Sequence, residues 1–68
     1  MNYTYKVIEV VGSSETGNDD AVKNAIDEAG KTLKHIGWFE VVKQTGHVEE
    51  GVIRHFQATL KIGFRLDK

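Results

Sequence analysis

The chain has 68 residues, no cysteine and a formal net charge of -1, with 9 Lys or Arg residues against 10 Asp or Glu residues. This length supports a single domain, residues 1–68, and the lack of cysteine excludes disulfides and thiolate metal sites. The balanced charge argues against a nucleic-acid surface, and the sequence shows neither a membrane span nor a signal peptide, so we expect a soluble cytoplasmic protein. Because one core of this size rarely supplies more than about 3–5 kcal/mol, we expect the chain to oligomerise.

The first half of the chain predicts a strand, a loop and a helix. Tyr3 to Val11 is rich in β-branched and aromatic residues, with apolar side chains on both faces, and predicts a strand. Gly12 to Gly17 predicts a loop, after which Asn18 or Asp19 can cap a helix. The helix is predicted from residue 21 or 22 to residue 35 by apolar side chains at helical spacing: Val22, Ala25, Ile26, Ala29, Leu33 and Ile36.

Glycines and basic residues predict where this helix ends. Gly37 is placed to end it in a left-handed conformation, and Gly30 is an unfavourable residue within it. The negative end of a helix dipole stabilises cations, and basic residues crowd the predicted last turns: Lys31, Lys34 and His35.

The rest of the chain predicts a β-hairpin. Trp38 to Val48 forms one strand, Glu49 to Gly51 the turn, and Val52 to Leu66 the other strand. In this last strand apolar and polar residues alternate, apart from Arg54, so one face is apolar and the other polar. A strand of this length spans roughly 50 Å, whereas a compact chain of this size has a radius of gyration of about 11 Å. The strand must therefore bend strongly or reach out of its own subunit.

The order β-α-β-β predicts an α+β fold with a three-stranded antiparallel sheet and one helix. The long strand lies centrally, its even-numbered residues pack on the helix, and Gly46 and Gly63 mark bulges where strands bend. One helix covers one face of the sheet, which leaves a polar face without intramolecular cover: His55, Gln57, Thr59 and Lys61. Open sheet edges and this uncovered face predict a closed, symmetric homo-oligomer.

Two side chains are candidates for binding a planar ligand. Trp38, the only tryptophan, either staples the helix to the sheet or provides a stacking platform for an aromatic ring. Gln57, on the polar face, is either an ordinary solvated or interface residue or a paired donor and acceptor for the edge of a heterocycle. Together, the two would suit a planar heterocycle that carries both donors and acceptors.

The remaining polar residues do not predict a catalytic or metal centre. His35 is interpreted as a cation at the end of the helix. His47 and His55 can face the same side of the hairpin, where a metal pair is an alternative, but two histidines without a carboxylate at a tight spacing rarely form a metal site. The segment 12–17 lacks the lysine of a phosphate-binding loop, and no Ser, His and Asp set suggests a triad. We therefore predict that the protein is not an enzyme and has no metal site.

Three segments resemble the dodecins, a family of small flavin-binding proteins. They are YKVIEVVGSS at 5–14, GWFEV at 37–41 and HFQATLKIGFRL at 55–66, so the resemblance spans nearly the whole chain. It implies a hollow dodecamer in which each sheet wraps around one helix, and in which two flavins stack between tryptophans of two subunits. It also implies that Trp38 stacks on the isoalloxazine ring and that Gln57 hydrogen-bonds its pyrimidine end. The implied role is storage, buffering and photoprotection of FMN or riboflavin.

The chain departs from some relatives near the implied ligand sites. Gly37 stands where some have an aspartate before the tryptophan, and Thr45 stands where some have an arginine. His47, near the expected pocket mouth, is a candidate replacement contact to the FMN phosphate. Some relatives also hold coenzyme A, although Glu28 and Tyr3 replace basic residues found in them. The basic residues that would hold coenzyme A in this chain are Lys31, Lys34 and Arg65.

Two other functions are alternatives to flavin storage. A flavoenzyme or flavin-dependent redox protein would need a substrate-sized opening beside the isoalloxazine, which two flavins packed face to face would block. A purely structural shell would bind no ligand of any kind. The sequence therefore predicts a flavin-binding homododecamer with no nucleic-acid or membrane partner, in preference to these two.

Overall fold

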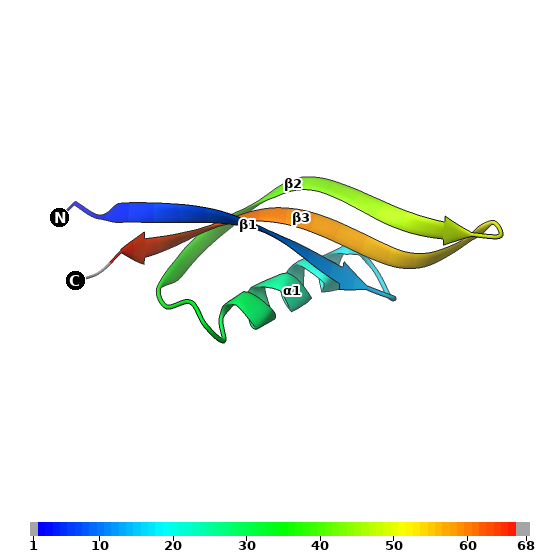
Figure 1. The fold of residues 1–68 in the computed structure, drawn as a ribbon, viewed down its shortest axis with the longest axis horizontal. Helices are drawn as coiled ribbons and strands as arrows, with labels where there is room; N and C mark the ends of the chain where they lie inside the picture. The colour runs from blue at the N-terminus through cyan, green and yellow to red at the C-terminus, as the bar shows by residue number, and fades with distance from the viewer. Residues whose placement is uncertain (1, 67–68) are drawn as a thin grey trace.

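A computed structural model describes residues 2–66, which form three strands and one helix (Figure 1). They are β1 (Thr4–Ser14), α1 (Asn18–Ala29), β2 (Ile36–Glu49) and β3 (Val52–Leu66). β3 lies centrally and pairs antiparallel with β1 on one side and with β2 on the other. The predicted element order, the antiparallel sheet and the bounds of the last strand are confirmed. The domain predicted over 1–68 includes residues 1, 67 and 68, which lie outside the described range.

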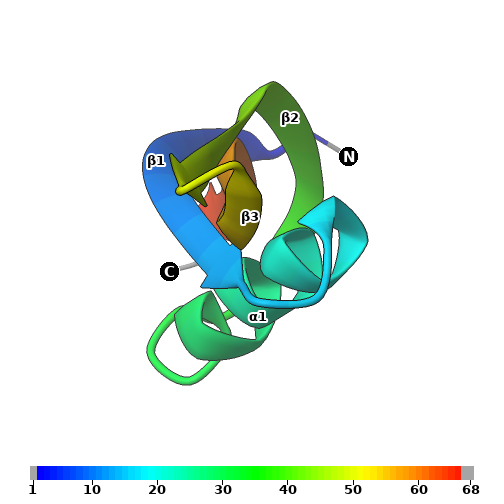
Figure 2. The ribbon, with the colours of Figure 1, turned by 90° about the vertical axis from the view of Figure 1, so that its right-hand side faces the viewer.

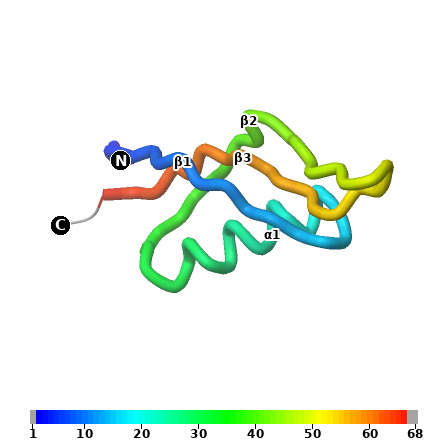
Figure 3. The backbone as a smooth tube through the Cα atoms, turned by 45° about the vertical axis from the view of Figure 1, so that its right-hand side comes forward, coloured from blue at the N-terminus to red at the C-terminus, as the bar shows by residue number. Residues whose placement is uncertain are grey.

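The sheet is long and curved, and it extends past the helix at both ends. The described residues span 52 × 20 × 13 Å with a radius of gyration of 14.0 Å, well above the value of about 11 Å for a compact chain of this size. Figure 1 shows the β2–β3 hairpin projecting beyond one end of α1 and the termini beyond the other, and Figure 3 shows this obliquely. Of the two predicted alternatives, the long strand reaches out of the body of the subunit.

The core lies between α1 and the facing side of β1 and β3. Leu60 and Ile62 are fully buried, and three alanines complete the buried cluster: Ala21, Ala25 and Ala58. α1 packs on β1 and β3, to one side of the twisted sheet (Figure 2). Gly12 allows this close approach, because a Cβ there would overlap the backbone oxygen of Ala21. The predicted packing of even-numbered β3 residues on the helix is confirmed, and the core is small.

Three register shifts bend the β2–β3 hairpin. β2 has one extra residue at Gly37 and another at Val42, and β3 has one at Arg54. The shift at Arg54 explains why the alternation of apolar residues breaks there, since one extra residue exchanges the two faces of a strand. The bulge predicted at Gly46 is wrong, because Gly46 pairs in regular register. Gly63 lies next to a bulge, but the extra residue is Gly37 on the partner strand β2.

The helix ends earlier than its apolar pattern predicts. It ends at Ala29, and Gly30 caps it with its N–H bonded to the carbonyl of Ile26. Glycine costs about 1 kcal/mol relative to alanine inside a helix, which favours ending the helix there. His35 then adopts a positive φ of 64°, the conformation predicted for Gly37, which instead belongs to β2. The basic residues expected in the last helical turns thus lie in the connection to β2: Lys31, Lys34 and His35.

The segment between β1 and α1 is shorter than the predicted loop. β1 continues to Ser14, and the helix begins at Asn18 after Gly17. Gly17 accepts a hydrogen bond at its carbonyl, and no side-chain bond caps the helix, so the cap predicted at Asn18 or Asp19 is wrong. The polar contacts at this end converge instead on Asp20, one turn into the helix.

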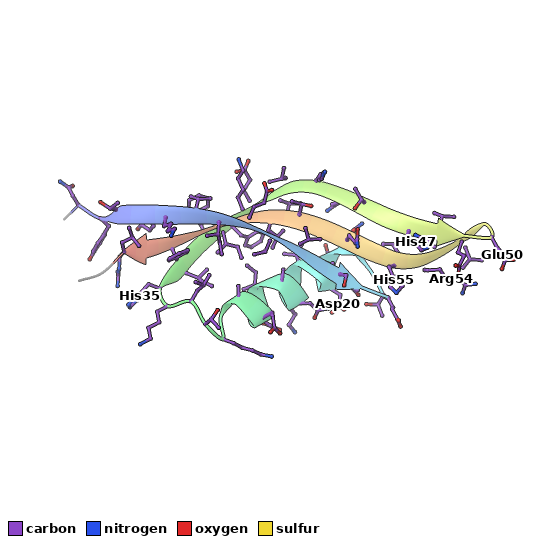
Figure 4. The ribbon with its side chains drawn as sticks, in the orientation of Figure 1. Asp20, His35, His47, Glu50, Arg54 and His55 are labelled. Carbon is purple, nitrogen blue, oxygen red and sulfur yellow. The ribbon has the colours of Figure 1, made fainter. Side chains whose placement is uncertain are left out.

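Hydrogen bonds to Asp20 tie the start of α1 to the end of β1 (Figure 4). The Ser14 hydroxyl donates to Oδ2 of Asp20 at 2.7 Å, the Thr16 hydroxyl donates at 3.2 Å and the Asn24 amide at 3.4 Å. These donors, Ser14 foremost, favour the carboxylate and hold the pKa of Asp20 below its ordinary value. The amide of Asn24 also donates to the carbonyl of Ser13 at 3.0 Å, which adds a second link between strand and helix.

Candidate functional site

The sheet face turned away from α1, hereafter the open face, is ordered into rungs that cross the three strands. Residues directly opposite each other on paired strands point to the same face. Starting from the hairpin tip, β3 supplies the centre of each rung: His55, Gln57, Thr59, Lys61 and Gly63. In the same order β2 supplies His47, Thr45, Lys43, Glu40 and Trp38. From the second rung onward β1 supplies Ser13, Val11, Glu9 and Val7.

The open face is not uniformly exposed, in contrast to the sequence prediction. Gln57 and Lys61 are exposed, but Thr59 is 8% exposed and Gly63 is buried. Val11 and Lys43 flank Thr59 on the two neighbouring strands. Side chains of the sheet itself therefore cover part of a face that the helix does not reach.

Trp38 lies on the open face with its indole ring against Gly63. A Cβ at Gly63 would overlap Cε2 and Cζ2 of the indole, so only glycine lets the ring approach the backbone of β3. Trp38 is nevertheless 44% exposed. It shares its face with Lys61 and not with the buried Leu60, so the interpretation of Trp38 as a staple between helix and sheet is wrong. An indole supported on one side and accessible on the other is a stacking platform.

Gln57 occupies a different part of the open face. It is exposed and lies opposite Thr45 on β2 and Ser13 on β1. Gln57 and Gly63, the partner of Trp38, are six positions apart on β3, which is about 20 Å along an extended strand. One chain places Trp38 and Gln57 on the same face but does not bring them together. A single planar ring system can meet both side chains only where two copies of the chain adjoin.

The rung nearest the hairpin tip carries two histidines. His47 and His55 lie directly opposite each other on β2 and β3, with ring centroids 6.3 Å apart and an angle of 37° between their planes (Figure 4). On the other side of β3, Oε2 of Glu15 lies 3.8 Å from Nε2 of His55. The prediction that the two histidines can face the same side is confirmed, and His47 lies one rung from Thr45.

The three basic residues predicted to hold coenzyme A do not form one cluster. Lys34 and Arg65 line the same shallow hollow, of about 470 Å³, between the α1–β2 connection and the end of β3. Lys31 instead donates to Oε1 of Glu28 at 3.1 Å, where both side chains are largely exposed. Two of the three predicted cations are therefore placed to act together.

Arg65 has defined partners beside this hollow. Its guanidinium lies 4.7 Å from the ring centroid of Tyr3, and its Nη2 lies 3.3 Å from Nδ1 of His35. Arg65 also lines a second hollow, of about 170 Å³, together with Gly37 and Tyr5. Its position is fixed by an aromatic face and an imidazole, which leaves the guanidinium oriented at the end of the sheet.

Sequence reasoning missed two contributors to the open face. An isolated glycine in a strand indicates either a bulge or a close approach, and only the register with Trp38 identifies Gly63 as a close approach. Glu15 fell in the predicted loop. Its place beside His55 follows from the pairing of β1 with β3, which ends at Ser14 opposite Phe56.

Two kinds of feature are absent from the part of the chain that the structure describes. Within residues 2–66, no three His, Cys, Asp or Glu side chains are grouped so as to hold a metal ion. No helix in the same range is long and apolar enough to cross a membrane. The helix α1 has 12 residues, against about 20 for a membrane span.

Comparisons with known proteins agree on one family. The dodecin family model matches residues 4–67. The dodecin of Thermus thermophilus is 41% identical over 68 residues, which are 100% of this chain and 99% of that protein. The structure of dodecin from Streptomyces coelicolor has a TM-score of 0.95 at 49% identity and covers 98% of this chain and 96% of that chain. Dodecin from Streptomyces davaonensis has a TM-score of 0.96 at 47% identity and covers 100% of both chains.

These findings give the open face a family context. The fold defines a small β-α-β-β protein whose long sheet carries an indole platform on the side away from its helix. The chain belongs to the dodecin family. The resemblance noted in the segments around Trp38 and Gln57 is therefore confirmed at the level of the family and the fold.

Proposed function

We propose that this protein binds FMN or riboflavin and stores it without turning it over. The observation that carries the proposal is the indole of Trp38, which rests on Gly63 and is 44% exposed. A flat, supported ring offers an isoalloxazine a stacking surface, and stacking of a base on an aromatic side chain contributes about 1–3 kcal/mol. Membership of a family of flavin-binding proteins supports the choice of ligand.

We propose that the flavin site forms between copies of the chain, in a hollow homododecamer. Because about 20 Å of strand separates Trp38 from Gln57, the Gln57 that bonds the pyrimidine edge of a flavin comes from a different copy than the indole beneath it. Unsatisfied apolar surface supports association: on the helix side of β2, Phe39 is 49% exposed and Val41 is 36% exposed. A native particle of 7.6 kDa, the mass of one chain, would contradict this assembly.

The residues around the proposed pocket favour the anionic flavin. Gly37 precedes Trp38 and brings no carboxylate, so this position does not repel a phosphate. Thr45, opposite Gln57, offers a hydroxyl, and His47 lies one rung further along β2. We propose that the imidazole of His47 contacts the FMN phosphate in place of the arginine that some relatives have at the position of Thr45.

Fluorescence of added flavin tests the proposal directly. Titration of FMN with the flavin-free particle should quench its emission, because close stacking on an indole provides a fast route for deactivating the excited ring. Trp38→Ala should weaken FMN binding about 10–100-fold, the equivalent of the stacking contribution. Trp38→Phe, which keeps a smaller ring, should recover part of the affinity.

The matched control is Phe39→Leu, which removes the neighbouring aromatic ring on the opposite face. It should leave FMN quenching within about twofold of the wild type, provided that light scattering shows an unchanged particle. Emission that stays constant at saturating wild-type protein would refute flavin binding. Equal affinity in Trp38→Ala and wild type would refute the stacking role.

Coenzyme A is proposed as a second ligand. Lys34 and Arg65 line one hollow, and two cations on one concave surface attract phosphate groups. Lys31 would have to release Glu28 in order to take part. Native mass spectrometry of the particle with coenzyme A should show binding that Arg65→Ala removes and Lys31→Ala only weakens. Binding that persists unchanged in Arg65→Ala would exclude this hollow.

A further inference from the structure

The rung at the hairpin tip holds two imidazoles, with one carboxylate beside them, that the flavin proposal leaves mostly unused. His47 on β2 lies opposite His55 on β3, and Glu15, just past the end of β1, lies on the other side of His55. The two imidazole centroids are 6.3 Å apart, and the carboxylate of Glu15 lies 3.8 Å from Nε2 of His55. Figure 4 shows both histidines near the end of the hairpin, close to the labelled Glu50 and Arg54.

The spacing of the imidazoles is close to what one metal ion requires. Two imidazoles that bind one Zn²⁺ through nitrogens about 2.0–2.1 Å from the metal have ring centroids roughly 5 Å apart. The observed separation is therefore about 1 Å too large. The side chain of His55 is 49% exposed, and the torsion that rotates an imidazole ring has a broad energy minimum. Ring rotation alone leaves each centroid on its Cβ–Cγ axis, so a change in χ1 of these two exposed side chains is also needed to bring their nitrogens to a common point.

The backbone fixes this pair more firmly than a chance meeting of surface side chains. His47 and His55 form the last regular pair before the register shift at Arg54. Such shifts re-aim side chains and increase local twist. Beyond it, Arg54 is held by Glu49, with Nε 3.6 Å from Oε1. The cation of Arg54 is thereby engaged by a carboxylate of the turn rather than directed at the imidazoles.

Glu15 has the position of an orienting group. A histidine that binds a metal through one ring nitrogen usually donates the N–H of the other to a carboxylate, which fixes the tautomer. Nε2 of His55 lies 3.8 Å from Oε2 of Glu15, beyond hydrogen-bond distance, but a small shift of the exposed Glu15 side chain would let it accept that N–H and leave Nδ1 for a metal. Imidazole ligands suit borderline cations such as Zn²⁺, Ni²⁺ and Cu²⁺, whereas Ca²⁺ and Mg²⁺ prefer oxygen.

We propose that His47 and His55 form a two-imidazole clamp for a borderline divalent transition-metal ion, with Glu15 positioning His55. Water completes the coordination, because the rung supplies fewer protein ligands than a closed structural zinc site. The clamp therefore binds a cation that exchanges with solvent and remains open to a further ligand. It does not depend on bound flavin, although His47 takes part in both proposals.

Equilibrium dialysis of untagged, flavin-free particle against Zn²⁺, with metal and protein both quantified, tests the clamp. The wild type should bind one Zn²⁺ per chain. His47→Gln and His55→Gln should each weaken binding at least about tenfold, because each loses the advantage of an intramolecular second ligand. Glu15→Gln should weaken it only a few-fold, since it acts through His55.

The third histidine provides the matched control. His35→Asn removes an imidazole outside the rung, and asparagine tolerates the positive φ of that position. This variant should bind Zn²⁺ like the wild type. Loss of binding in His35→Asn with retention in His55→Gln would overturn the assignment, as would equal binding in His47→Gln, His55→Gln and wild type. Circular dichroism and particle mass confirm that each variant is folded. Because no flavin is present, failure of the flavin proposal leaves this result unaffected.

Discussion

On the helix side of β3, Ala58, Leu60 and Ile62 are 0% exposed, whereas on the open face Gln57 and Lys61 are exposed and Thr59 is 8% exposed. The helix side of β3 is covered within one chain by α1, although Phe39 and Val41 on β2 stay exposed on the same side of the sheet. The open face is covered only where side chains of the sheet lie over it, and much of it is left accessible. Stability and ligand binding are thus assigned to opposite sides of one strand, and substitutions on the two sides should separate them.

The largest effect is expected on the helix side. Leu60→Ala removes a fully buried side chain and should lower the free energy of unfolding by about 2–5 kcal/mol. Lys61→Ala, its neighbour on the open face, removes an exposed side chain that lies opposite Glu9 and Glu40 on the flanking strands and should cost less than about 1 kcal/mol. Urea unfolding at one fixed protein concentration measures both, because assembly contributes to apparent stability. Equal losses of unfolding free energy in the two variants would contradict the view that the helix side, and not the open face, carries the stability.

The contact between α1 and β1 comes next. Gly12→Ala places a Cβ against the backbone oxygen of Ala21 and the side chain of Ala25, and such overpacking costs about 1–3 kcal/mol. Gly17→Ala is the matched control, since Gly17 has an extended backbone and nothing lies within 4 Å of its added Cβ. Thermal unfolding should show a clearly lower midpoint temperature for Gly12→Ala and little change for Gly17→Ala. The reverse order would mean that the helix does not approach the strand as described.

On the open face the expected effect is on ligand affinity. Gly63→Ala forces the indole of Trp38 off the backbone of β3 and should weaken FMN binding about tenfold, within the range of one stacking contact. In a Trp38→Ala background the same change should have little further effect, because the two residues act through one ring. Fluorescence titration of the wild type, the two single variants and the double variant completes this double-mutant cycle. Additive losses would show that Gly63 acts independently of the platform.

The elements differ in how far the sequence determines them. β3 was predicted to the residue, because alternation from Phe56 onward leaves only one way to place its apolar side on a helix. The C-terminal end of α1 was predicted wrongly, because Leu33 and Ile36 continue the helical spacing although the helix ends at Ala29, with Gly30 as its cap. Ile36 packs against the core from the next strand and Leu33 is half-buried in the connection. Their spacing does not distinguish that arrangement from a longer helix.

The candidate site was predicted in its residues but not in its geometry. Trp38 and Gln57 were identified as side chains suited to a planar ligand. Their shared face does not follow from strand periodicity alone, because Trp38 and Thr45, the partner of Gln57, are seven positions apart on β2. Both the shared face and the separation of six positions along β3 depend on the bulges at Gly37 and Val42, which set the register of β2. A bulge arises from tertiary fit, so local composition does not place it. That one chain does not bring Trp38 and Gln57 together therefore emerged only from the register.

The smallest expected effect concerns the contacts that anchor the helix over its face. Asp20 accepts hydrogen bonds from Ser14, Thr16 and Asn24, and these lower its pKa in the folded protein. A carboxylate with a lowered folded-state pKa stabilises the protein above its unfolded pKa, about 3.9, and loses that contribution as pH falls through the lower folded value. Asp20→Asn should therefore reduce stability at pH 7, and the difference from wild type should shrink below about pH 4.

The control for this last prediction is Asp27→Asn, which removes a carboxylate from the same helix beyond its first turn. Unfolding midpoints measured between pH 7 and pH 3 should converge for wild type and Asp20→Asn, and Asp27→Asn shows how much of any change comes from removing one carboxylate from this helix. Convergence is specific to a group whose proton affinity differs between folded and unfolded states. A constant difference for Asp20→Asn would show that its side chain acts through shape alone. The link between β1 and α1 would then rest on Asn24 and on the packing at Gly12.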